Sequence, residues 1–409
     1  MKRIIFIIAL MALLCQFLNS QSASITDFLQ PVSSAQRLFC TLNMDYSGTD
    51  TMSAKGLLNL TYTKYYSSLP FSYSITGFLY INYANLQQGS TNIYQDNGQF
   101  SPQIHADIQK YLSDKSDFFI AGNSSISYQK PFEYKDGYLQ TLIGPGVGYG
   151  RIVVATAMAQ ALRIEEYLLS EKLISGEFSK EITIEIASHC SKLNEYATKY
   201  GDKHPIDWYM DLEKILVKSG KLVDNRISPY SLFRIQEVLN RERVYDRKIG
   251  WRVTGYLNYE FNADIPKQNN GSSVDEYAAI LRLEIGYPLS NRLQFNHYTN
   301  YTYDNTFKYP AANNRIYSTT SLAYKFTNLF DFLLTYRLDF NAVNGITYTI
   351  NRYQTFSFNL YYYVENNIFL QLVAGLQNNL VSGYQNYYPN PNTNTLNKSI
   401  TLNIGYRFF

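Results

Sequence analysis

Strict alternation between apolar and polar residues is the feature that most constrains this chain. In residues 251–261 every second residue is apolar or small, whereas the residues between them, including Arg252 and Glu260, can face water. Successive side chains of a strand point to opposite faces of a sheet, so this segment predicts a strand with one apolar and one charged face. The same pattern returns in 280–289, 330–340 and 400–408. Long strands of this kind predict an all-β transmembrane barrel with an aqueous interior.

Composition is consistent with a barrel wall that averages two different faces. Tyrosine is the extreme residue, at 39 of 409, with 24 Phe and 2 Trp. Charged residues make up 17% of the chain, below the roughly 25% of an ordinary soluble protein. A mean hydropathy of −0.25 is nevertheless too polar for a bundle of membrane helices. The net charge of +3 is small, so we expect no nucleic-acid partner.

The first residues have the charged and apolar regions of a secretory signal peptide. Lys2 and Arg3 precede an apolar run at 4–14, and we predict a signal peptide over 1–22. A retained membrane helix is disfavoured because the run is shorter than about 18 apolar residues. A lipoprotein anchored at Cys15 is disfavoured because the residue before it is a bulky leucine.

Two blocks of predicted strands are separated by a segment of different character. About six strands are expected in the first block and about eight in the second, which gives about fourteen antiparallel strands in total. An even number is what a closed bacterial single-chain barrel requires. The predicted division is barrel strands over 23–150, a helical insertion over 151–247 and barrel strands over 248–409.

Connection lengths alternate in the way expected for such a barrel. Connections after even-numbered strands are tight, as at Ser290-Asn291, whereas those after several odd-numbered strands are long, as at 84–101 and 381–396. Outer-membrane barrels have short turns on the periplasmic side and longer loops outside. We therefore predict that the tight turns face the periplasm and the long loops face the exterior.

The segment between the strand blocks changes to helical spacing. Ile182, Ile186, Leu193 and Tyr196 form one apolar stripe after a possible N-cap at Ser179. Three more helices are predicted near 156–174, near 205–219 and from Pro229 onward. Because this insertion follows the sixth strand, strand parity predicts a four-helix domain in the periplasm.

The last residues carry a resemblance to a known class of proteins. Gly405-Tyr406-Arg407-Phe408 is followed by a terminal aromatic, Phe409. This pattern resembles the C-terminal recognition signal of Gram-negative outer-membrane β-barrel proteins. The resemblance implies an outer-membrane location and recognition by the barrel-assembly machinery, with Tyr406, Phe408 and Phe409 as the assembly signal.

Other motifs give no indication of enzyme chemistry. The glycine-rich segment 144–151 lacks the spacing of a dinucleotide-binding or phosphate-binding loop, which favours a close-packed strand end. The four histidines do not cluster, and His189 beside Cys190 is only a weak metal signal. No nucleophile motif surrounds the serines. We therefore predict no enzyme activity, no cofactor and no metal.

Charged residues on the predicted wet face are the most interpretable set. Two interpretations remain open: the charges form ion pairs that stiffen and solvate the interior, or they create a field that screens solutes in a pore. The predicted pore-lining residues are Arg252, Glu260, Arg282, Glu284, Lys325, Asp331, Arg337, Asp339 and Arg407.

The sequence thus favours a porin-like outer-membrane channel for small polar solutes, in contact with outer-membrane lipid. The alternative is an outer-membrane anchor or an export and assembly platform, whose helical domain docks a periplasmic partner protein. The two differ in whether the lumen must be open.

Overall fold

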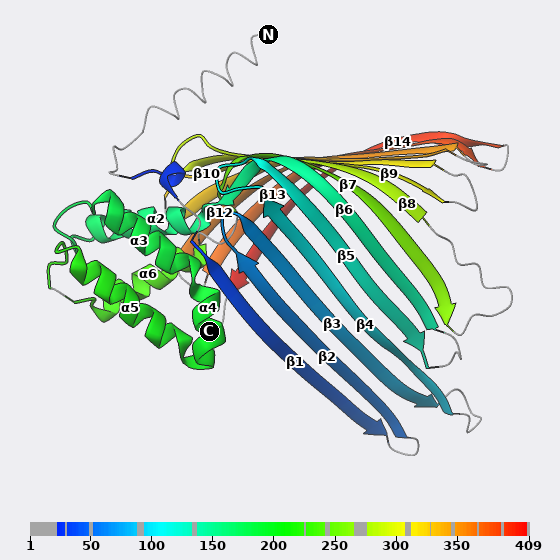
Figure 1. Cartoon of the computed structure of the whole chain (residues 1–409), viewed down its shortest axis with the longest axis horizontal. Coiled ribbons are helices and arrows are strands. Elements are labelled where there is room, and N and C mark those ends of the chain that lie inside the picture. Colours follow the sequence, from blue (N-terminus) through cyan, green and yellow to red (C-terminus); the bar gives the residue numbers. More distant parts are fainter. Residues whose placement is uncertain are drawn as a thin grey trace, which may run out of the picture.

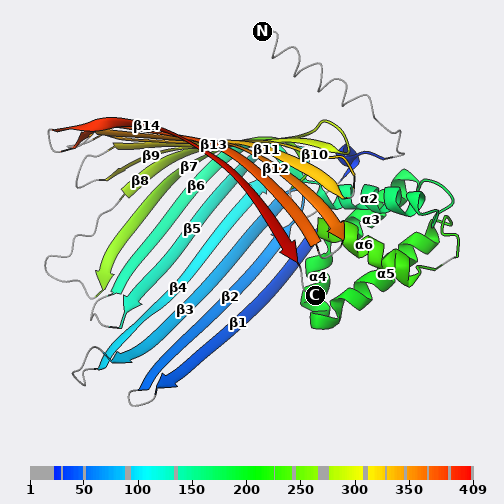
Figure 2. The same ribbon diagram turned by 180° about the vertical axis from the view of Figure 1, so that it is seen from behind.

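Fourteen strands form one continuous antiparallel sheet, in which each strand pairs with its neighbours in the sequence. A computed structural model describes residues 23–28, 31–48, 52–87, 94–132, 137–224, 226–241, 246–265, 276–306, 312–327, 329–344, 348–365, 368–385 and 388–406. The sheet is strongly curved, and a group of helices lies at one end of it (Figure 1; Figure 2).

The predicted number and order of strands are confirmed. The first block contains β1 (Ser33–Gly48), β2 (Met52–Ser67), β3 (Phe71–Gln87), β4 (Tyr94–Tyr111), β5 (Phe118–Pro131) and β6 (Gly137–Val154). The second contains β7 (Lys248–Ile265), β8 (Glu276–Pro288), β9 (Leu293–Thr306), β10 (Ala312–Lys325), β11 (Phe330–Asn344), β12 (Tyr348–Glu365), β13 (Ile368–Gln385) and β14 (Tyr388–Tyr406).

Several strands are longer than their alternation suggests. The predicted loop 381–396 is mostly strand, because β13 continues to Gln385 and β14 begins at Tyr388. The backbones remain paired through this region, with one irregularity between Val381 and Gly383. Backbone pairing does not need an apolar face, so alternation fails as a signal where both faces are polar.

The sheet has two free edges. Within the described residues, β1 pairs only with β2 and β14 pairs only with β13. The structure therefore shows the fourteen-stranded antiparallel wall, with β1 and β14 unpaired along the seam where a barrel would close.

Between β6 and β7 the chain forms a helical unit. In its described part, the unit contains α2 (Thr156–Ser170), α3 (Lys180–Ser191), α4 (Leu193–Tyr200), α5 (His204–Lys218) and α6 (Pro229–Arg241). The expected cap at Ser179 is present, since its side chain accepts a hydrogen bond from the Ile182 N–H. The stripe predicted as one helix is instead two, because α3 ends and α4 begins at Lys192.

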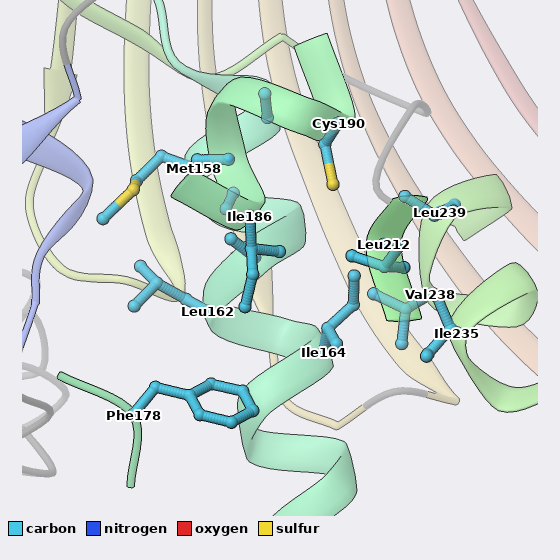
Figure 3. Packing of buried hydrophobic residues seen from close by; sticks show 14 of the residues in the cluster. Met158, Leu162, Ile164, Phe178, Ile186, Cys190, Leu212, Ile235, Val238 and Leu239 are labelled. Atoms are coloured by element: carbon cyan, nitrogen blue, oxygen red, sulfur yellow. The ribbon is translucent and has the colours of Figure 1, made fainter. Parts of the chain in front are cut away.

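One hydrophobic core holds the helical unit together (Figure 3). Met158, Leu162 and Ile164 of α2 are almost completely buried in it, and helices α3, α5 and α6 supply further aliphatic residues. Ile25 and Phe28 belong to the same core, although they precede β1. Ile25 begins a short 3-10 helix, η1 (Ile25–Asp27), which Ser24 caps, and Phe28 follows it directly. The segment before the first strand is therefore packed into a unit that begins more than a hundred residues later.

A stripe of glycines lies along the inward face of β6. Four consecutive inward positions of β6 lack a side chain: Gly144, Gly146, Gly148 and Gly150.

Side chains from both neighbouring strands fill the space above this stripe. A Cβ at Gly144 would lie 2.0 Å from the Oδ1 atoms of both Asn123 on β5 and Asn258 on β7. Side chains of β5 and β7 therefore converge over β6, which makes this face of the sheet the concave, inward one. The glycine-rich segment 144–151 is close-packed, as predicted. It lies within β6 and not at the end of the strand.

We predict that Gly148→Ala destabilises the sheet. Its Cβ would lie 2.1 Å from the Phe119 ring and 2.6 Å from the Val253 carbonyl oxygen, and the backbone oxygen cannot move aside easily. Overpacking of this kind typically costs about 1–3 kcal/mol of unfolding free energy.

The matched control is Gly56→Ala on β2, where an added Cβ meets nothing within 4 Å. Unfolding midpoints in urea and detergent, followed by electrophoretic mobility without heating, would compare the two variants. Equal midpoints would show that the stability of the sheet does not require glycine at position 148.

Candidate functional site

Polarity is inverted between the two faces of the wall. On β7 the outward side chains Trp251, Leu257 and Tyr259 are exposed, with Leu257 at 71%, whereas the inward Thr254 and Asn258 are buried. A soluble sheet would bury its apolar face. The inward face, where polar side chains gather, is therefore the candidate site.

Eight of the nine predicted pore-lining residues lie on the inward face, as the strand registers show. Arg252 stands opposite both Gly150 of the glycine stripe and Glu284, and Lys325 stands opposite Asp331. The remaining members are connected through the registers of β7–β8, β8–β9, β9–β10 and β10–β11: Glu260, Arg282, Arg337 and Asp339. Arg407, Phe408 and Phe409 lie outside the described residues, as does the side chain of Tyr406.

The centre of the candidate site is a contact that crosses two strands. Arg252 Nε donates to Glu284 Oε2 at 2.8 Å, and Arg252 Nη2 bonds to the same oxygen. Arg252 Nη1 also donates to Gln109 Oε1 at 2.7 Å. Gln109 is on β4, so this bond passes over β5 and β6. The inward curvature of the sheet (Figure 1), with bare glycine positions on β6, brings the two side chains within reach.

Two arginines on the inward face lie over tyrosine rings. The Arg282 guanidinium is 5.6 Å from the ring centroid of Tyr256 and 6.0 Å from that of Tyr298. Arg337 lies 4.9 Å from the Tyr317 ring and also donates from Nε to Asp339 Oδ2 at 2.8 Å. A cation over a ring face retains its charge while gaining a favourable contact with the ring quadrupole.

Other predicted pore-lining charges have polar partners or are buried. Glu260 accepts hydrogen bonds from Gln140 Nε2 at 2.6 Å and from Asn262 Nδ2 at 3.1 Å. Lys325 and Asp331 face each other in register at the helical end and are nearly inaccessible. These contacts favour the interpretation in which the charges stiffen a wet wall, and they leave Arg282 as the best candidate for acting on a solute.

Sequence reasoning did not include Gln109, Gln140, Tyr256 and Tyr298 in the site. The alternation in β4 and β6 places Gln109 and Gln140 on the polar face, so the sequence pattern could have predicted that they face inward. Gln140 is on β6, which pairs directly with β7, whereas the contact of Gln109 with β7 depends on the curvature of the sheet, which alternation does not encode.

The helical unit contains a second group of interacting charges. Glu166 pairs with Arg163 on its own helix and with Arg292 in the turn between β8 and β9, at 2.5 Å in each case. Arg163 is buried, and the Glu165 side chain is completely buried. These residues are buried because α2 supplies much of the core of the helical unit.

Histidines in the described residues have structural contacts. His189 is buried, its Nε2 lies 2.8 Å from the Trp208 carbonyl oxygen, and burial lowers the pKa of its imidazole. Among the described residues, no group of three or more His, Cys, Asp or Glu side chains is placed to hold a metal ion.

Comparisons with known proteins give no family assignment: no protein-family model and no curated protein matches this sequence significantly. No helix in the described part of the chain is long and apolar enough to cross a membrane.

We predict that Glu284→Gln lowers stability more than loss of a peripheral pair does. The change leaves the partly buried Arg252 without its carboxylate, at a cost of about 1–3 kcal/mol. The control is Asp304→Asn, which breaks a pair with the largely exposed Arg315 and should cost about 0.5 kcal/mol or less. Urea midpoints in detergent measure both, and a larger loss in the control would contradict the central role of the Arg252 contact.

We also predict that Glu165 makes the helical unit less stable as pH rises. Burial raises the pKa of its carboxyl from 4.5 to about 7, although a hydrogen bond from the Phe178 N–H opposes the shift. The folded state therefore holds a proton that the unfolded state releases. The stability from this proton is complete below the unfolded pKa and is lost as pH rises through the folded one.

Glu165→Gln should remove this pH dependence, because glutamine stays neutral and can still accept the bond from Phe178. At about pH 8 the unfolding free energy of the variant should exceed that of the parent by at most about 3 kcal/mol, and near pH 4 the two values should converge. Loss of helical far-UV signal on heating measures the effect. The control is Glu171→Gln, an exposed carboxyl just after the same helix; an equal gain there would refute the assignment to Glu165.

Proposed function

We propose that the protein is an outer-membrane β-barrel that works as a porin-like channel for small polar solutes. The observation that carries the proposal is the inverted polarity of the wall. Outward aliphatic residues such as Leu257 and Ile400 are 71% and 80% exposed. Exposed apolar surface continuing over many strands is unfavourable in water, whereas it matches the hydrocarbon of a bilayer.

Strand lengths support a membrane-spanning wall. The shortest strand, β8, has 13 residues. At about 3.3 Å per residue and a tilt of about 40°, it rises roughly 33 Å, more than the apolar band of about 25 Å in such barrels. Closure would require β14 to pair with β1.

Polar groups on the outward face bond to one another. His297 Nδ1 and Nε2 lie 2.9 Å from the hydroxyls of Thr320 and Thr299, and Thr299 lies 2.9 Å from Ser318. Mutual hydrogen bonding is what buried or lipid-facing polar groups need, since hydrocarbon offers no partners.

Strand parity supports a periplasmic helical unit. The unit follows β6, and the turns after β2, β4 and β8 lie at the same end of the sheet. The longer connection from β7 to β8 lies at the opposite end, where β13 and β14 are nevertheless joined by a short one. Short turns face the periplasm in outer-membrane barrels. In this orientation the C-terminal end of β14 is also periplasmic, where the barrel-assembly machinery would read Tyr406, Phe408 and Phe409.

The inward face favours neutral or weakly charged solutes. Arg252 and Arg337 already pair with Glu284 and Asp339, so their fields largely cancel. Amide groups and tyrosine rings provide much of the remaining surface, and they bind polar solutes without requiring a net charge.

A docking or assembly role remains the second candidate, because α5 exposes an apolar stripe. Ile206, Met210 and Val217 are 63%, 54% and 39% exposed, while Trp208 and Leu212 of the same helix face the core. A second apolar face on a helix is typical of a protein-binding surface. This function would tolerate a blocked lumen.

Single-channel recording on the purified, refolded protein tests the channel. We expect conductance in the wild type, and a shift of ion selectivity toward cations in Arg282→Glu. The shift should weaken with salt, because charges are screened over about 10 Å at 0.1 M.

The control is Arg337→Glu, which places a carboxylate beside Asp339 and should lower thermal stability more than it changes selectivity. Absence of conductance in both the wild type and a variant with shortened outer loops would reject the channel and favour the docking role.

A further inference from the structure

Helix α4 lies against the beginning of β1 and bonds to its backbone. The Ser34 N–H donates to Glu195 Oε1 at 2.8 Å. Two residues further along the strand, the Gln36 carbonyl oxygen lies 2.9 Å from Thr198 Oγ1, whose hydroxyl it shares with the Asn194 carbonyl oxygen at 3.0 Å. Side chains on consecutive turns of α4 thus hold two backbone groups of the first strand.

These two backbone groups belong to the free edge of β1. In an antiparallel pair, successive residues direct their N–H and C=O groups alternately toward the partner strand and away from it. Since Ser34 and Gln36 bond to α4, their groups point away from β2. They therefore point along the edge that has no strand neighbour in the structure. The α4 side chains therefore bond to backbone groups that a neighbouring strand would otherwise bond.

The strand that could take these places is β14. It forms the opposite edge of the sheet, and it runs toward the helical end, whereas β1 runs away from that end. A β1–β14 pairing would be antiparallel like the thirteen others in the sheet and would bring the last residues of β14 next to Ser34 and Gln36. One set of backbone groups cannot bond to α4 and to β14 at the same time.

We infer that α4 is a reversible cap on the base of the β1–β14 seam, displaced when the end of β14 pairs with β1. The inference rests on the proposed barrel. The seam then has two states at its helical end: an open state in which α4 holds the β1 edge, and a closed state in which β14 holds it. Opening would expose the end of β14 on the side of the helical unit.

The packing of α4 suits a cap that can leave and return. None of its side chains is fully buried, although Leu193 and Tyr196 pack against the edge of the core and the Tyr196 hydroxyl donates to Asp211 Oδ2 on α5 at 2.6 Å. Glu195 and Thr198 can therefore release β1 through movements of α4 that do not disrupt the fully buried part of the core. The unit itself stays close to β1, because Ile25 and Phe28 are buried in its core and Lys180 Nζ lies 2.6 Å from Asp27 Oδ1. Tethering keeps the effective concentration of α4 near the β1 edge high.

Disulfide formation across the seam tests the cap in the full-length protein. Cys40→Ser and Cys190→Ala remove the free thiols of the described chain. Leu38→Cys is then combined in turn with Ile400→Cys, Leu402→Cys or Ile404→Cys, all exposed on the outward face. Outward residues opposite each other on paired strands have Cβ atoms about 4.5–5.5 Å apart, close enough to form a disulfide on mild oxidation.

Weakening the cap should increase this crosslink. We expect Glu195→Ala with Thr198→Val to raise the crosslinked fraction of the best pair at least about threefold, because β14 no longer competes with α4. The control, Glu185→Ala with Lys218→Ala, removes an exposed ion pair of the same helical unit and should leave the fraction unchanged. Thr198→Val alone, with a smaller increase expected, replaces the double variant if that does not fold.

An unchanged fraction relative to the control would overturn the cap, as would the absence of a crosslink in every variant. Conductance of the same preparations separates this failure from that of the proposed function. A protein that conducts but shows no competition keeps the channel and loses the cap, whereas one that neither inserts nor conducts loses the barrel on which the inference rests.

Discussion

The fold depends on one requirement: each strand must bond its backbone to neighbouring strands while presenting two surfaces of opposite polarity. Alternation meets both demands, because a shift of pairing by one residue would turn every Leu and Tyr of the outward face inward. Continuous registers from β1 to β14 keep that separation across the whole sheet. Inward amides, rings and paired charges, and the helical unit at one end, all take their positions from this wall.

Much of the wall could be predicted from the sequence, because its signal is local. The residues next to Trp251 and Arg252 indicate which face of the sheet each side chain occupies. The tight turn at Ser290-Asn291 indicates that the chain reverses there into an antiparallel strand. Alternation fails where both faces are polar, as in the last part of β13 and the first part of β14. There only the pairing of the backbones shows a strand.

The candidate site was harder to predict, because its contacts depend on curvature. Arg252 and Glu284 could be assigned to one face, and their register follows from the pairing of consecutive strands. The bond from Arg252 to Gln109 arises only because the bare glycine positions of β6 let distant strands converge. Likewise, the break at Lys192 that creates α4 has no counterpart in the apolar spacing of the stripe. Each of these features is set by the packing of segments distant in sequence.

The burial of Ile25 and Phe28 has a consequence for the order of synthesis. The ribosome makes these two residues long before α2, so the helical unit completes its core only when this segment packs against it. Contacts over such sequence separations are slow to form. An excised segment covering only the helices would lack both side chains, and its hydrophobic core would be incomplete. Completion of this core therefore depends on a segment that lies before the first strand.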